Sequence, residues 1–111
     1  IAGGAYCLPS EILRAVRHSV CDQTETFHGI VGRDPFHALF PVIGFSHVKT
    51  LPKGFPKDFP YPEYIRCKDY SCCHNVSEDF FTSPDWLDNT VEMFRIMKPF
   101  LDFVNATIDE F

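Results

Sequence analysis

Residues 83–111 read SPDWLDNTVEMFRIMKPFLDFVNATIDEF and carry the clearest fold signal in the chain. Ser83 and Pro84 are typical of a helix start, where a hydroxyl caps free amides and proline fits the first turn. The apolar residues that follow recur at helical spacing: they are Trp86, Leu87, Val91, Met93, Phe94 and Met97. Pro99 interrupts the pattern, which resumes at Phe100. We therefore expect either one bent helix or two helices over about residues 84–110.

Two more helices are predicted upstream of this stretch. Apolar residues recur at spacings of three and four across residues 10–21, which predicts a helix there. Asp34 is a typical N-cap and Pro35 a typical first helical residue, so we expect a short helix over residues 35–39. Pro41 ends it, because proline disfavours helical backbone at the residue before it.

The middle of the chain predicts less regular structure. Residues 42–48 are β-branched and aromatic enough for one strand, and residues 27–31 are the only partner in view. Residues 51–64 contain a near repeat of Pro-Lys-Gly-Phe and Pro-Lys-Asp-Phe, and their four prolines exclude a helix or a central strand. We expect an extended arm whose aromatic side chains pack on the rest of the protein.

Length and charge limit the possible functions. The chain has 111 residues and a net charge of −5, which favours a single domain over residues 1–111. An acidic protein offers little attraction for a nucleic-acid backbone, so no nucleic-acid partner is expected. The longest uncharged stretch, residues 35–48, is too short to cross a bilayer and predicts no transmembrane segment. From Glu78 onward, eight acids and two bases indicate either a solvated helix face or, as the alternative, a surface for a basic partner.

Five cysteines suggest an oxidising compartment. Together with the absence of an initial Met, they lead us to expect a secreted protein whose signal peptide was removed. Cys7 and Cys21 flank the first predicted helix, about 20 Å apart, which is beyond disulfide reach. We therefore expect both to bond into the cluster formed by Cys67, Cys72 and Cys73. The fifth cysteine would stay free or link two chains in a covalent homodimer.

The expected fold is thus mainly α-helical. It is a small disulfide-stapled domain of three to four helices, with a long irregular Pro-rich segment and at most one short β-hairpin. Two N-glycosylation sequons begin at Asn75 and Asn105 and fit an extracellular route. Asn75 is the better acceptor, since Asn105 falls inside a predicted helix.

No catalytic or metal-binding motif is present. Cys67, Cys72, Cys73 and His74 are zinc-ligand types, but their spacing is not that of a zinc site, and disulfide-bonded cysteine cannot ligate. We expect no metal and no cofactor.

Polar pairs give no sign of an enzyme either. His28, His37 and His47 follow one another at separations that no single helix face accommodates, so we interpret them as core or boundary residues. The pairs that could be drawn as catalytic are common in any polar loop: Ser71 with His74, and Glu78 with Asp79. We expect a protein that is not an enzyme.

Twelve phenylalanines are the most unusual feature of the composition. They either fill a solid core or line a cavity for an apolar ligand. The candidate pocket residues are Phe36, Phe40, Phe45, Phe94, Met97 and Phe103. From this we predict a secreted, non-enzymatic binding protein that carries a small hydrophobic ligand. The alternative is an extracellular signalling, toxin or defence protein that acts through a protein-binding surface.

Overall fold

The structure is a computed structural model that describes residues 1–110. Along the chain, the elements are β1 (Ala2–Ala5), α1 (Ser10–Asp22), α2 (Thr24–Val31), α3 (Phe36–Leu39), α4 (Pro62–Ile65), β2 (Tyr70–Cys73), α5 (Asp79–Thr82) and α6 (Trp86–Ile108). Within residues 1–110 there are six helices, and the expected number of three to four is wrong. The additional helices, α2, α4 and α5, have at most eight residues each, too few for a clear apolar period.

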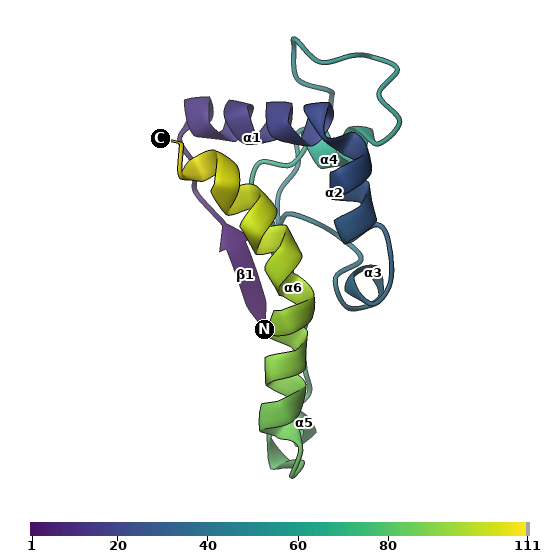
Figure 1. The fold of residues 1–111 in the computed structure, drawn as a ribbon, viewed down its shortest axis with the longest axis vertical. Coiled ribbons are helices and arrows are strands. Elements are labelled where there is room, and N and C mark those ends of the chain that lie inside the picture. Colours follow the sequence, from purple (N-terminus) through teal and green to yellow (C-terminus); the bar gives the residue numbers. More distant parts are fainter. Residues whose placement is uncertain (111) are drawn as a thin grey trace.

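Helix α6 is the longest element; β1, α1, α2 and α3 pack against its C-terminal half, whereas α5 lies beside its N-terminal end (Figure 1). The side chains of Met97, Phe100 and Val104 are buried there, against α1, α2, α3 and β1. Pro99 lies inside the helix without ending it. The ribbon changes direction in this middle part, as expected where proline removes one backbone hydrogen bond. Of the two alternatives for this stretch, the single bent helix is the one observed.

Helices α1 and α2 pack one after the other against α6. Helix α1 closely matches the helix expected over residues 10–21, and it buries Val16 and Val20. Gln23 breaks the helical backbone before α2 begins. The hydroxyl groups of Ser19 and Thr107 lie 2.7 Å apart and join α1 to the end of α6.

The sheet contains two antiparallel strands, with Ala2 opposite Cys73 and Ala5 opposite Tyr70. It therefore joins distant parts of the chain and is not a hairpin. The expected strand over residues 42–48 is wrong: only His47 forms an isolated bridge there, to Cys67. Residues 27–31, its expected partner, belong to α2. A sequence pattern indicates β propensity but does not locate the partner strand. In this sheet, β1 and β2 are about seventy residues apart along the chain.

The disulfide staple is also wrong, because all five cysteines are free thiols. Cys7 is exposed, whereas Cys67 and Cys72 are buried. Cys72 and Cys73 are successive residues of β2 and differ in exposure, as neighbours on opposite faces of a strand do. With no cysteine bridged, none is left over from pairing, and the covalent homodimer stays a prediction.

Aromatic side chains fill the interior in place of disulfides. The Phe27 ring lies 5.0 Å from that of Tyr64 and 5.1 Å from that of Phe103. The Phe36 ring lies 5.0 Å from Phe40 and 5.7 Å from Phe100. These buried rings meet one another in edge-on and tilted contacts, which stabilise a core beyond the burial of their area alone.

The Pro-rich arm is irregular up to Tyr61 and forms a loop on the outside of the molecule (Figure 1). The expectation that residues 51–64 contain no helix is wrong at their end, because α4 begins at Pro62, and proline is tolerated at the first helical position. Phe55 and Phe59 of the arm are buried, and Phe55 packs on the His18 ring with centroids 4.6 Å apart. The arm is therefore held by its aromatic side chains, as expected. None of the helices formed by residues 1–110 combines the length and the apolar character that crossing a membrane requires.

Candidate ligand pocket

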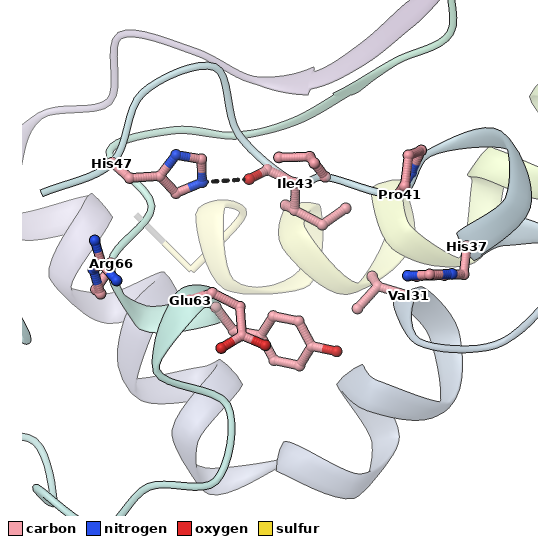
Figure 2. A pocket seen from close by; sticks show the side chains of 9 residues that line it. Val31, His37, Pro41, Ile43, His47, Glu63 and Arg66 are labelled. Carbon is pink, nitrogen blue, oxygen red and sulfur yellow. Dashed lines mark hydrogen bonds between the residues drawn. The ribbon is translucent and has the colours of Figure 1, made fainter. Parts of the chain in front are cut away.

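A pocket of about 360 Å³ opens between the end of α2, α3 with the loop that follows it, and α4 (Figure 2). One part of its wall is apolar and the other carries polar and titratable groups. The lining residues are Val31, His37, Pro41, Val42, Ile43, His47, Glu63, Tyr64 and Arg66.

A buried carboxylate holds the loop that forms the upper wall. Asp69 is 2% exposed, and its oxygens accept hydrogen bonds from the backbone amides of Phe45 and Ser46, each at 3.1 Å. The Ser71 hydroxyl donates to the same carboxylate, and the Gly44 amide donates to the Ser71 carbonyl at 2.7 Å. Gly44 has φ +83°, which favours glycine. Asp69 thus fixes the loop that brings Ile43 and His47 to the pocket.

His47 is oriented by the backbone of the same loop. Its Nε2 lies 2.7 Å from the Ile43 carbonyl oxygen (Figure 2). Because a carbonyl oxygen can only accept, this contact assigns the proton to Nε2 and leaves Nδ1 as an acceptor. The pocket therefore contains an imidazole with a fixed ring orientation.

Behind this imidazole lies the thiol of Cys67, which is fully buried. Its Sγ lies 3.5 Å from the Ile43 carbonyl oxygen and 3.3 Å from that of Glu63. Burial is the main reason that the pKa of Cys67 is raised to about 12, and the nearby Asp69 carboxylate raises it further. At neutral pH the group is therefore a neutral thiol that stabilises the fold, and not the thiolate that nucleophilic attack or metal binding needs.

Helix α4 supplies the polar wall. The Tyr64 hydroxyl lies 2.8 Å from His28 Nδ1. Burial raises the pKa of Tyr64 to about 12, with smaller contributions from Glu63 and Tyr61. Arg66 follows at the C-terminal cap of α4, and its Nε donates to the Val48 carbonyl at 2.8 Å.

Arg66 is thereby held at one edge of the pocket as a permanent cation. Within residues 1–110, the ion pairs are Glu92 with Arg95 and Lys98 with Asp102. Arg66 and Glu63 therefore line the same pocket without forming a salt bridge with each other.

The six candidate pocket residues do not surround this volume. Phe36, Phe40 and Met97 are buried in the core, whereas Phe45 and Phe94 are exposed. Phe103 is half-buried and packs on Phe27. The pocket instead uses His37 and His47, which sequence reasoning assigned to the core or its boundary. Glu63, Arg66 and the supporting Asp69 carried no sequence signal, because their spacing matches no motif.

The cysteine cluster does not form a metal site. Among residues 1–110 no group of three or more potential ligands lies together. His74 Nδ1 lies 3.1 Å from the Leu39 carbonyl oxygen, and Ser71 bonds to Asp69, so Ser71 and His74 do not form a catalytic pair. Asn75 is exposed in a loop and Asn105 is exposed on α6. Secretion and glycosylation stay predictions.

A second hollow, of about 670 Å³, lies between α2 and the Pro-rich arm. His28 forms part of its wall and stacks on Tyr61, with ring centroids 4.2 Å apart. His28 of this hollow and Tyr64 of the first pocket contact each other through the hydrogen bond described above.

The fold and the pocket define a class: a small helical domain with a two-stranded antiparallel sheet and a ligand-sized pocket of mixed polarity. Residues 1–103 match the model of a family described as conserved hypothetical protein (DUF2461), and the chain belongs to this family. That description names no activity. No curated protein and no solved structure matches the chain.

Proposed function

We propose that this protein binds a small organic ligand with an apolar body and an anionic group in the pocket beside α4. The observation that carries the proposal is the composition of its wall. Val31, Pro41, Val42 and Ile43 face the same volume as Arg66 and the imidazoles of His37 and His47. Apolar walls with a few oriented polar groups are typical of small-molecule sites, which commonly enclose about 300–1,000 Å³.

Arg66 is the charged group of the pocket that favours an anion, and Glu63, the other charged residue in the lining, carries the opposite sign. Arg66 is a cation at any physiological pH, and its guanidinium suits the planar geometry of a carboxylate. The backbone contacts of Arg66 and His47 hold these groups in place before a ligand arrives, which lowers the cost of ordering them. A volume of about 360 Å³ equals that of about a dozen water molecules, enough for a ligand of similar heavy-atom number.

Binding, and not catalysis, is the activity that we propose. His47 and Arg66 donate their hydrogen bonds to backbone carbonyls, which orients the two side chains but does not activate a nucleophile. The sequence also predicted a non-enzymatic protein that binds a small ligand. The proposed site differs in its wall, which contains aliphatic residues and Arg66 in place of the predicted phenylalanines.

The test uses three probes with the same chain length: octanoate, octan-1-ol and octylamine. We expect octanoate to shift the amide NMR signals of residues 41–47 and 63–66 and to bind more tightly than the other two. Arg66→Gln should weaken octanoate binding at least tenfold, because a charge-assisted hydrogen bond contributes about 1.5–3 kcal/mol. Arg66→Lys should keep part of the affinity.

Lys68→Gln is the matched control, since Lys68 is an exposed cation two residues away that does not line the pocket. Its octanoate affinity should stay within twofold of the original. Signals that move elsewhere in the molecule would contradict the proposal. So would octan-1-ol binding as tightly as octanoate, or equal losses in Arg66→Gln and Lys68→Gln.

A further inference from the structure

Large apolar side chains are exposed along the outer part of α6. Of the eight large hydrophobic residues that are exposed within residues 1–110, five lie together on α5 and α6. We call this surface the α5–α6 ridge, and its residues are Phe81, Trp86, Leu87, Val91 and Phe94. Phe81 and Leu87 are each 57% exposed. Apolar residues scattered over a surface are normal, whereas a contiguous group of them marks an interaction site.

The ridge has the geometry of a helix-binding surface. Leu87, Val91 and Phe94 are spaced four and three residues apart on α6, so they form one stripe along the helix. Phe81 of α5 packs on Trp86 with ring centroids 6.0 Å apart and extends the stripe past the helix start. Figure 1 shows this half of α6 projecting from the rest of the molecule, with only α5 beside it.

The surroundings of the ridge are acidic. Residues 78–91 contain four acids, Glu78, Asp79, Asp85 and Asp88, and no base. None of the four belongs to an ion pair in the part of the chain that the structure describes. The next acid along the helix, Glu92, is paired with Arg95. An apolar stripe beside uncompensated acids is complementary to an apolar stripe beside bases.

From this complementarity we infer that the α5–α6 ridge docks a basic amphipathic helix of a partner protein. Apolar side chains of the partner cover Leu87, Val91 and Phe94, and its Lys or Arg residues meet Asp85 and Asp88. A second copy of this chain fits less well, because two ridges placed face to face would bring like charges together. The site is separate from the ligand pocket and does not depend on it.

Trp86 provides a built-in signal, since it is the only tryptophan in the chain and lies on the ridge. The probe is a Leu/Lys peptide of about 18 residues, which forms about five turns with one apolar face. We expect it to bind with micromolar affinity, to shift Trp86 emission to shorter wavelength, and to bind more weakly as salt rises. Two control peptides should bind at least tenfold more weakly. One has the same composition in a scrambled order that lacks the apolar face, and the other keeps the apolar face but has Glu in place of Lys.

Two pairs of variants separate the ridge from general surface effects. Leu87→Ser with Val91→Ser should weaken peptide binding at least tenfold, whereas Phe45→Ser, which removes an equally exposed ring elsewhere, should leave it unchanged. Asp85→Asn with Asp88→Asn should weaken binding severalfold and reduce its salt dependence. Asp109→Asn with Glu110→Gln, at the other end of α6, should have no such effect. Circular dichroism checks that each variant is folded.

Three outcomes would overturn the inference. The first is equal binding of the amphipathic and scrambled peptides. The second is concentration-dependent self-association, measured by light scattering, that Leu87→Ser abolishes, because the occupant would then be a second copy. The third is a Trp86 shift with phosphatidylcholine vesicles but not with the peptide, because the surface would then bind lipid.

Discussion

A single carboxylate, that of Asp69, determines the shape of the ligand pocket at the scale of individual residues. It is buried, and it accepts hydrogen bonds from two successive backbone amides and one hydroxyl. A buried acceptor with several donors stabilises a loop because each donor would otherwise be left without a partner. The loop over residues 43–47 has little regular structure of its own, so its position depends on the Asp69 contacts together with the backbone hydrogen bonds of Gly44 to Ser71 and of Lys68 to Ser46.

Replacing Asp69 by Asn tests this dependence. An amide has one acceptor oxygen in place of two, and its NH₂ group would face a donor. We expect Asp69→Asn to lower the free energy of unfolding by about 2–3 kcal/mol, since hydrogen bonds to charged groups contribute about that amount. Urea denaturation measures the change, and faster hydrogen exchange of the Phe45 and Ser46 amides locates it.

The exposed Asp109→Asn provides the reference for this substitution. Substitutions at exposed positions usually change stability by less than about 0.5 kcal/mol. If Asp69→Asn and Asp109→Asn were equally stable, the carboxylate would not be holding the loop.

At the scale of elements, the two strands join distant parts of the chain through a backbone contact that only glycine allows. Gly4 lies opposite Ser71 and has φ +131°, a conformation that side chains rarely adopt. A Cβ atom at Gly4 would also overlap the backbone of Tyr70 and Ser71. The pairing of β1 with β2 therefore requires glycine at this position.

Alanine substitutions at two glycines should have opposite effects. Gly4→Ala should destabilise the protein by about 2 kcal/mol or more, because it adds strain and forces the strands apart. Gly29 lies exposed within α2, and a Cβ atom added there would meet nothing within 4 Å beyond its chain neighbours and the backbone of its own helix. Gly29→Ala should stabilise by about 0.5–1 kcal/mol through helix propensity. Thermal and urea unfolding of both variants measure the pair, and a stable Gly4→Ala protein would contradict the strand register.

At the scale of the whole molecule, the sequence predicted what depends on local pattern. Both α1 and α6 follow from apolar spacing over ten residues or more, and Pro99 is visible as an interruption. The sheet and the fate of the cysteines depend on contacts between distant residues. The sequence gives the number of cysteines and their spacing along the chain. It does not give the distances between their sulfur atoms, which decide whether a disulfide can form.

The ligand pocket was hidden from sequence reasoning for the same reason. Its lining comes from α2, α3 and the loop after it, and α4 with its C-cap Arg66, and these segments meet only in the folded chain. The excess of phenylalanine reflects the core and not the pocket, because the rings of Phe27 and Phe36 both pack on that of Phe100. His28 and His47 are half-buried, as expected of boundary residues, whereas His37 is exposed. That His37 and His47 line a pocket was not predicted, because a lone His between apolar residues looks the same at a core boundary and at a pocket wall.

Buried thiol and phenol groups make the whole molecule less stable at alkaline pH. Burial raises the pKa of the Cys67 and Cys72 thiols to about 12, whereas an unfolded thiol has a pKa of about 8.5. The folded state therefore holds these protons more tightly than the unfolded state does. Their contribution to stability is complete below about pH 8.5 and is lost as pH rises toward 12. Tyr64, with its pKa raised to about 12, adds to the loss above about pH 10.

We therefore expect the free energy of unfolding to fall between pH 8.5 and 10.5, by about 2 kcal/mol for Cys67 alone. Cys67→Ala should be less stable at pH 7, because it leaves a small cavity, but should lose less stability over this pH range. Cys7→Ala is the control, since Cys7 is exposed and its removal should leave the pH profile unchanged. Urea unfolding at a series of pH values, under reducing conditions, gives all three profiles. If the free energy of unfolding fell equally with pH in Cys67→Ala and in the original protein, burial would not be holding the Cys67 proton. The loss of stability at alkaline pH would then come from other groups.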